Sequence, residues 1–161
     1  MAPMLVTLAP LLAGPQIASF INRDGTRLHV VLSDGHLSGA GAGQWSIASN
    51  SYRLRHTGSP VAILTGPRTA SAGEITMIAF RGQPGTRTFG QPTAGFASGN
   101  TASTLSDGAT LIITTAKDAD RSGQVFANLT PVPPDEPVVC ADATVAAATK
   151  WLAKTPACGN E

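Results

Sequence analysis

The most constraining feature of this sequence is an apolar segment that runs through a turn into a serine surrounded by small residues. Residues 60–64 are apolar, Thr65-Gly66-Pro67 follows, and the chain continues as Thr69-Ala70-Ser71-Ala72-Gly73-Glu74. This order predicts a strand, a tight turn and a helix that begins near Ser71. Such a turn can lift the Ser71 hydroxyl to the rim of a sheet, beside the N–H groups of a helix N-terminus, as a nucleophile requires. The same spacing also suits a serine that only caps the helix.

Strand and helix patterns alternate around this unit. Two pairs of β-rich segments flank Asp-Gly turns and predict hairpins, at residues 16–21 with 26–32 and 101–105 with 109–115. The remaining expected elements are helices over 1–13, 71–81 and 141–154 and strands over 60–65 and 86–90. The strand over 60–65 is expected to be parallel to its neighbour and covered on both faces, because its residues are apolar almost throughout. The 161 residues therefore predict a single α/β domain, residues 1–161, with a mixed sheet.

Composition excludes several classes of function. The net charge of +1, without a Lys/Arg cluster, gives no basis for binding nucleic acid. The apolar segment at residues 1–13 is too short to span a bilayer. It also lacks the positively charged N-terminal region of a signal peptide, because the first arginine is Arg23. Cysteine and histidine lack zinc-ligand spacing, so we expect no metal and no cofactor. Cys140 and Cys158 flank the last helix, which leaves a mutual disulfide barely within reach; Cys158 pairing with a cysteine elsewhere is the alternative.

Several short motifs occur in a fixed order over about half the chain, from Val61 to Val138. After the serine segment come Phe89-Gly90-Gln91-Pro92-Thr93-Ala94-Gly95, Leu105-Ser106-Asp107-Gly108, Ile113-Thr114-Thr115-Ala116, Asp120-Arg121-Ser122-Gly123 and Pro133-Pro134-Asp135-Glu136-Pro137-Val138. This series resembles the C-terminal-processing, or tail-specific, serine peptidases. The resemblance implies the ClpP/crotonase-like spiral of ββα units for the catalytic domain.

The resemblance also implies roles for individual residues. Ser71 would be the nucleophile, the Ala72 N–H one oxyanion donor and Glu74 a supporting carboxylate, although Glu74 also fits the acid of a capping box. A peptide substrate would lie extended beside residues 93–100, with Thr93, Gly95 and Phe96 as the substrate-binding residues.

The sequence departs from the family pattern at the general base. Tail-specific members carry a lysine where this chain has Phe96, and a phenyl ring cannot accept a proton. The chain is therefore more similar to the branch with nisin-resistance, tricorn-type and retinoid-binding homologues, whose catalytic members use a histidine well before the serine. His29, His36 and His56 do not match that position, and Lys117 lies in no motif. We expect the chain to be the C-terminal portion of a catalytic domain, with the base supplied by a preceding region.

Two functions follow as expectations. The first is a serine peptidase that cleaves a peptide or protein substrate through an acyl-enzyme on Ser71 and acts in the periplasm or outside the cell. The second is a non-catalytic ligand-binding homologue, or an inactive fragment of the same fold.

Asp135 is expected to fix a turn, with orientation of a histidine as its alternative role.

Overall fold

Two sheets form the frame of the molecule. The computed structural model describes residues 1–39, 45–46, 54 and 58–155. One set of strands is antiparallel: β1 (Gln16–Asn22), β2 (Arg27–Ser33), β3 (His36–Gly39), β4 (Trp45–Ser46), β7 (Ser98–Thr104) and β8 (Thr110–Asp120). The other set is parallel: β5 (Val61–Thr65), β6 (Thr86–Gly90) and β9 (Glu136–Pro137). The predicted α/β class is confirmed, and within these described residues the two strand orientations are divided between two sheets.

The antiparallel sheet has the strand order β4-β3-β2-β1-β8-β7. Both predicted hairpins are confirmed, β1 with β2 and β7 with β8. Strand β1 also pairs with β8, which brings Phe20 opposite Asp118. Residues 40–44, which follow β3, lie outside the described residues, but Trp45–Ser46 pairs with β3 as a short strand.

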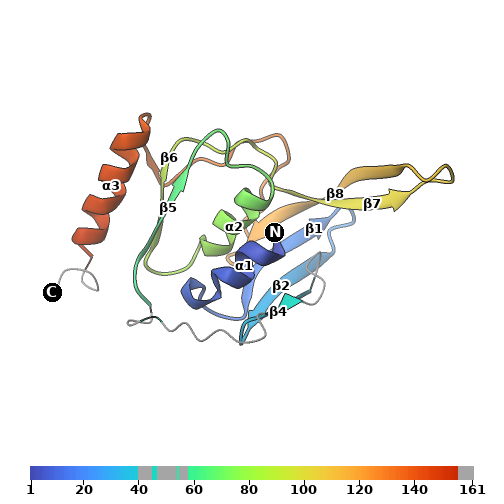
Figure 1. The fold of residues 1–161 in the computed structure, drawn as a ribbon, viewed down its shortest axis with the longest axis horizontal. Helices are drawn as coiled ribbons and strands as arrows, with labels where there is room; N and C mark the ends of the chain where they lie inside the picture. Colours follow the sequence, from blue (N-terminus) through green and yellow to red (C-terminus); the bar gives the residue numbers. More distant parts are fainter. Residues whose placement is uncertain (40–44, 47–53, 55–57, 156–161) are drawn as a thin grey trace.

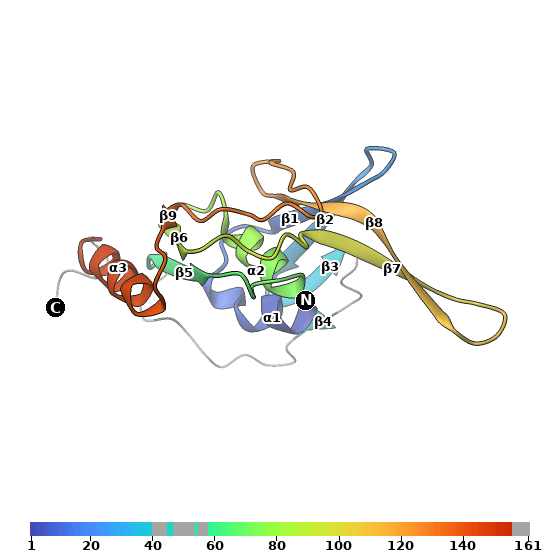
Figure 2. The ribbon, with the colours of Figure 1, turned by 90° about the horizontal axis from the view of Figure 1, so that it is seen from above.

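The parallel sheet has the order β5-β6-β9 and carries helix α3 (Ala141–Ala153). Strand β5 is parallel, as its apolar run predicts, but the expectation that both its faces are covered is wrong. Leu64 is 49% exposed, because the outer face of this narrow sheet is covered only in part. Figures 1 and 2 show α3 at one end of the molecule and the β7–β8 hairpin projecting from the other.

Of the remaining helices, α2 is largely buried and α1 is buried on one side only. Helix α2 (Ala72–Phe80) contacts β1 and β8, lies between the two sheets in Figure 1, and is buried from Glu74 to Phe80. Helix α1 (Ala2–Thr7) packs on α2 and β3, and a 3-10 turn, η1 (Ala9–Leu11), follows it. The predicted helix over 1–13 is therefore shorter, since Pro10 cannot continue the hydrogen-bond pattern of α1. None of the helices within the described ranges is both long and apolar enough to cross a membrane.

Candidate active site

Ser71 lies at the junction between the parallel sheet and the buried helix. It is the N-cap residue of α2, it is exposed, and its φ and ψ are 49° and −109°. A non-glycine residue rarely adopts a positive φ, and such strain gathers at functional sites. The preceding turn is fixed by hydrogen bonds from the Thr69 N–H to the Gly66 carbonyl (2.8 Å) and from the Gly66 N–H to the Thr69 hydroxyl (3.1 Å). The turn therefore holds the serine in one strained orientation.

The Glu74 carboxylate is the polar centre beneath this turn. It is fully buried, and in the described part of the chain it accepts four hydrogen bonds. The N–H groups of Ser71, Gly95 and Phe96 donate to it over 2.8, 2.9 and 2.8 Å, and the Thr93 hydroxyl donates over 2.5 Å. Ser71 and Glu74 also form a capping box, as the spacing predicts. The geometry gives Glu74 a positioning role, because its oxygens hold the serine turn and the 93–96 loop together.

The predicted substrate-binding residues belong to the loop that donates hydrogen bonds to Glu74. Thr93 and Gly95 are buried, and the Thr93 hydroxyl also accepts the Val132 N–H over 2.9 Å. Phe96 is 48% exposed. Among the residues that the structure describes, these three do not line the cleft that contains Ser71. The structure brings together Ser71, Glu74 and Thr93, and Gly95 and Phe96 join them through their backbone N–H groups.

A cleft of about 300 Å³ opens beside Ser71 and Ala72. Its other described lining residues come from the N-terminus, β1, β2, α2, β7 and β8: Met1, Phe20, Asn22, Leu28, Ile75, Ser98, Gly99, Asn100, Thr101, Thr115, Ala116 and Asp118. This described lining includes no histidine and no lysine. Ser71 thus lines a cavity of mixed polarity that is large enough for a side chain.

Asp118 is the ionisable side chain that sequence reasoning missed. It is 1% exposed, and burial, with the nearby Glu74 charge as a smaller cause, raises its pKa to about 7. The Oδ1 atom is buried and has no hydrogen-bond partner among the described residues. The sequence signal that could have indicated a buried Asp118 is the alternation of side chains along β8, in which Ala116 and Asp118 are buried and Lys117 is exposed.

The remaining candidates for a base lie away from the cleft or outside the description. His29 and His36 are exposed on β2 and β3, and His29 Nδ1 lies 3.2 Å from the Ser19 hydroxyl. Lys117 is exposed, and His56 lies outside the described residues.

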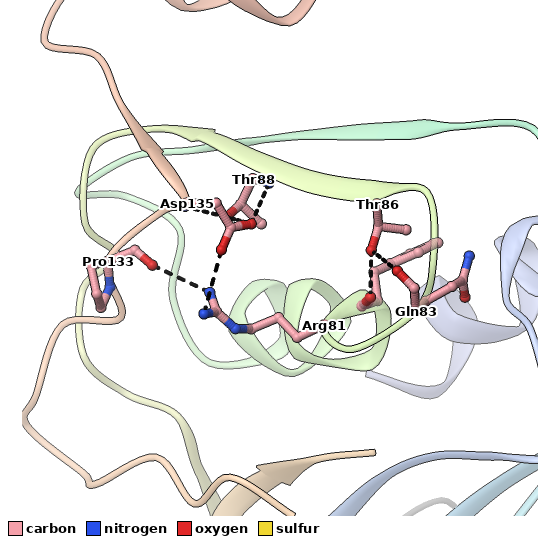
Figure 3. A network of polar contacts seen from close by, with 7 residues as sticks. Arg81, Gln83, Thr86, Thr88, Pro133 and Asp135 are labelled. Carbon is pink, nitrogen blue, oxygen red and sulfur yellow. Dashed lines mark hydrogen bonds and ion pairs between the residues drawn. The ribbon is translucent and has the colours of Figure 1, made fainter. Parts of the chain in front are cut away.

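Asp135 belongs to a separate polar network, shown in Figure 3. Its Oδ2 accepts hydrogen bonds from the N–H (2.8 Å) and hydroxyl (2.7 Å) of Thr88, while Arg81 lies 3.7 Å from Oδ1. Bonds from Thr88 and charge from Arg81 and Arg87 hold its pKa below the usual value, although burial opposes them as the largest single cause. Its partners among the described residues fasten the 133–137 segment to β6 and do not include a histidine. Among the described residues, Cys140 is an exposed free cysteine. Cys158 lies outside the described residues.

Residues for a metal centre are not gathered in the described ranges, which contain no cluster of three His, Cys, Asp or Glu side chains. The described cleft therefore offers the Ser71 hydroxyl beside the helix N–H groups and the buried Asp118 carboxyl, together with further polar side chains: Asn22, Ser98, Asn100, Thr101 and Thr115.

Comparison with known proteins places these features in context. The sequence profile of Peptidase family S41 matches residues 7–138. The nisin-resistance protein of Lactococcus lactis subsp. lactis is 30% identical over 135 residues, which are 84% of this chain and 41% of that protein. A lipoprotein from Streptococcus agalactiae superposes with a TM-score of 0.70 at 27% identity, over 94% of this chain and 49% of that one. This chain therefore spans less than half the length of these two relatives.

A more distant structure shares the fold. The photosystem II D1 C-terminal processing protease superposes with a TM-score of 0.61 at 20% identity, covering 98% of this chain and 36% of that one. The arrangement of two sheets around α2 is therefore one that also occurs in proteases.

Proposed function

Because this chain belongs to Peptidase family S41, we propose that it is the C-terminal portion of a serine peptidase catalytic domain and that Ser71 is its nucleophile. The observation that carries the proposal is the strained, exposed Ser71 at the N-cap of α2, directly beside a cleft. A positive φ at a serine between strand and helix is the backbone geometry of a nucleophile elbow. A serine that only caps a helix ordinarily has β-region dihedrals instead.

The reaction would proceed through an acyl-enzyme. The Ser71 hydroxyl would lose its proton to a base and attack the carbonyl carbon of the scissile peptide bond. The Ala72 N–H lies in the first turn of α2, where N–H groups lack intrahelical acceptors, and it would donate to the oxyanion. The base would return the proton to the leaving amine, and water would then hydrolyse the ester.

The general base is proposed to be a histidine from a region that precedes this chain. Phe96 occupies the position of the family lysine, and the described cleft lining contains neither histidine nor lysine. The chain spans about 41% of the nisin-resistance protein, which leaves room for such a region in a longer polypeptide.

The substrate is proposed to be an extended peptide that adds to the edge of the antiparallel sheet. Strand β7 is at the edge of the sheet formed by the described residues, and its first four residues line the cleft: Ser98, Gly99, Asn100 and Thr101. Free N–H and C=O groups of an edge strand can pair with a peptide backbone. Endoproteolysis and carboxyl-terminal processing are distinguished by comparing peptides that have free and amidated C-termini.

The test is covalent labelling of the complete polypeptide with a fluorophosphonate. We expect one adduct on Ser71 and cleavage of an unfolded peptide, and we expect Ser71→Ala to abolish both. Ser98→Ala is the matched control, because Ser98 lines the same cleft, and it should retain labelling. Undiminished turnover by Ser71→Ala would refute the assignment.

A non-catalytic ligand-binding function is the second candidate. It is favoured by the lack of a histidine or lysine in the described lining of the cleft. A protein of this kind would bind its ligand in the cleft but leave Ser71 unlabelled, so the same experiment separates the two.

We also propose that the protein acts outside the cytosol. This proposal derives from the relatives, one a nisin-resistance protein and the other a lipoprotein. Fractionation of the source cells tests it, with recovery in the cytosolic fraction as the contrary result.

A further inference from the structure

The buried carboxyl of Asp118 is not used by the proposed acyl-transfer reaction. It lines the cleft that contains Ser71, and it lies on β8 opposite Phe20. Its Oδ1 is buried without a hydrogen-bond partner among the described residues, whereas the oxygens of nearby Glu74 are both engaged. A buried polar atom without a partner is destabilising, so its persistence points to a partner that arrives from the cleft.

The surroundings of Asp118 are negative. Strands β1 and β7 contain no charged residue in their sequences, and Glu74 is the charged residue of α2. On β8 itself, Lys117 is exposed and Asp120 accepts hydrogen bonds from Ser122 and Gln124. The described lining of the cleft includes no arginine or lysine side chain to neutralise Asp118, and the one cationic group that this chain places there is the Met1 α-amino group. A cation that enters the cleft would therefore find one carboxylate to pair with and a second one nearby.

We propose that Asp118 is a specificity-determining residue which receives a basic side chain, lysine or arginine, of the peptide bound beside Ser71. The inference rests on the proposed peptidase function for its substrate class, but its test does not require cleavage. The cleft of about 300 Å³ accommodates the apolar stem of such a side chain against Phe20, Leu28 and Ile75. The charged head then reaches the carboxyl, where low dielectric strengthens the pairing.

Burial, with the Glu74 charge as a smaller cause, raises the pKa of this carboxyl to about 7, so the protonated form predominates below that pH. A neutral Asp118 could instead donate a hydrogen bond to an uncharged substrate group. The two modes differ in their ligand, since only the ionised form prefers a cation to an uncharged side chain of equal length.

The test measures the binding of peptides to the Ser71→Ala variant of the complete protein at pH 8. This variant lacks the proposed nucleophile, so the bound peptide is not cleaved during the measurement. The probes are fluorescent alanine/serine decapeptides in which one lysine is moved along the sequence, each paired with the norleucine peptide. We expect lysine at one position to bind about tenfold more tightly than norleucine. Asp118→Asn in the same background should reduce that ratio to within about twofold, whereas Asp107→Asn, on an exposed turn, should keep it.

The outcomes separate this inference from the proposed function. Equal binding of lysine and norleucine peptides at every position overturns the assignment of Asp118, even if Ser71 is labelled by fluorophosphonate. A lysine preference that survives Asp118→Asn overturns it as well. If Asp118→Asn does not fold, as monitored by circular dichroism, the pH dependence of the lysine/norleucine ratio in the Ser71→Ala parent decides instead. A preference for lysine at pH 8 that is lost at pH 5, where Asp118 is protonated, supports the inference, and a preference that is equal at both pH values overturns it. A lysine preference of this kind without Ser71 labelling supports the inference and removes the peptidase function.

Discussion

Ser71 is held in a backbone conformation that favours glycine, although the chain has a serine there. Its φ of 49° with ψ of −109° is roughly the mirror image of the extended region, where a Cβ atom is in steric conflict with the backbone. The neighbouring hydrogen bonds of Glu74 and Thr69 fix this conformation from both sides. Strain that is over-determined by its surroundings is the kind that functional residues carry.

Replacing Ser71 with glycine should therefore stabilise the protein relative to Ser71→Ala. Both variants lack the hydroxyl, so their difference isolates the backbone, and glycine is also the better N-cap residue of the two. We expect Ser71→Gly to unfold with a free energy about 1–2 kcal/mol higher than Ser71→Ala, measured by urea denaturation. Equal stabilities would show that the turn is not strained.

Glu74→Gln should destabilise the fold and lower the labelling rate of Ser71. The carboxylate accepts four hydrogen bonds within the described structure, and a glutamine NH₂ group would face N–H donors instead of accepting from them. We expect a loss of about 2–4 kcal/mol in the free energy of unfolding. Glu136→Gln is the control, since Glu136 is exposed in an ion pair with Arg87, and its loss should be far smaller.

Asp118 makes stability depend on pH in the opposite sense to most carboxylates. Its folded pKa of about 7 lies above the unfolded value of 3.8, so the folded state keeps a proton that the unfolded state has released between these values. The free energy of unfolding should therefore fall as pH rises from about 4 to 7, by up to about 1.4 kcal/mol per unit from this group, and level off above. Asp118→Asn should lose this slope and gain stability relative to the parent between pH 5 and pH 8. Parallel profiles for the two proteins would contradict the assignment.

At the scale of elements, the site depends on how one loop and one extended segment pack on α2. The loop at 91–97 follows β6 and donates hydrogen bonds to Glu74. The segment at 130–137 is bound to this loop by the hydrogen bond from the Val132 N–H to the Thr93 hydroxyl, and to β6 by the hydrogen bonds that Asp135 accepts from Thr88. Helix α2 supplies both Ser71 and Glu74. The arrangement therefore links the serine turn to a segment some 60 residues further along the chain.

Gly95 is the position at which this packing is tightest. It has a φ of +88°, and a Cβ there would lie 2.9 Å from backbone atoms of Thr130 and Pro131. Gly25 has a similar φ of +85° but open space around it, so Gly25→Ala reports the backbone strain alone. We expect Gly95→Ala to lose at least about 2 kcal/mol more than Gly25→Ala in thermal or urea unfolding. Similar losses would mean that the 130–137 segment moves freely away.

At the scale of the whole molecule, the cleft and helix α3 lie on different sheets. The match to the peptidase family ends at residue 138, before α3 begins at Ala141. The helix contacts β5 and β6, and the Trp151 ring lies 5.7 Å from the Phe89 ring, between centroids. Stability contributed by α3 should therefore be separable from the chemistry of Ser71.

Trp151→Ala should lower stability without affecting the cleft. Loss of the ring that covers Phe89 should decrease the free energy of unfolding by about 2 kcal/mol, because Trp151 is only half-buried. Val145→Ala, an exposed change on the same helix, should be nearly neutral. The rate of fluorophosphonate labelling at Ser71 should stay unchanged in both variants. Slower labelling in Trp151→Ala would show that α3 supports the site.

The sequence alone determined the local units of this protein. Apolar runs, Asp-Gly turns and the Ser71–Glu74 spacing specify the segment of β5, both hairpins and the start of α2, because each of these patterns lies within a short stretch of the chain. Tertiary structure decided the rest: that parallel and antiparallel strands form separate described sheets, that Glu74 joins the serine turn to the 93–96 loop, and that Asp118 on β8 is buried in the cleft beside Ser71. These features arise from packing between segments 20 to 50 residues apart, and the desolvation of Asp118 exists only once those segments have excluded water.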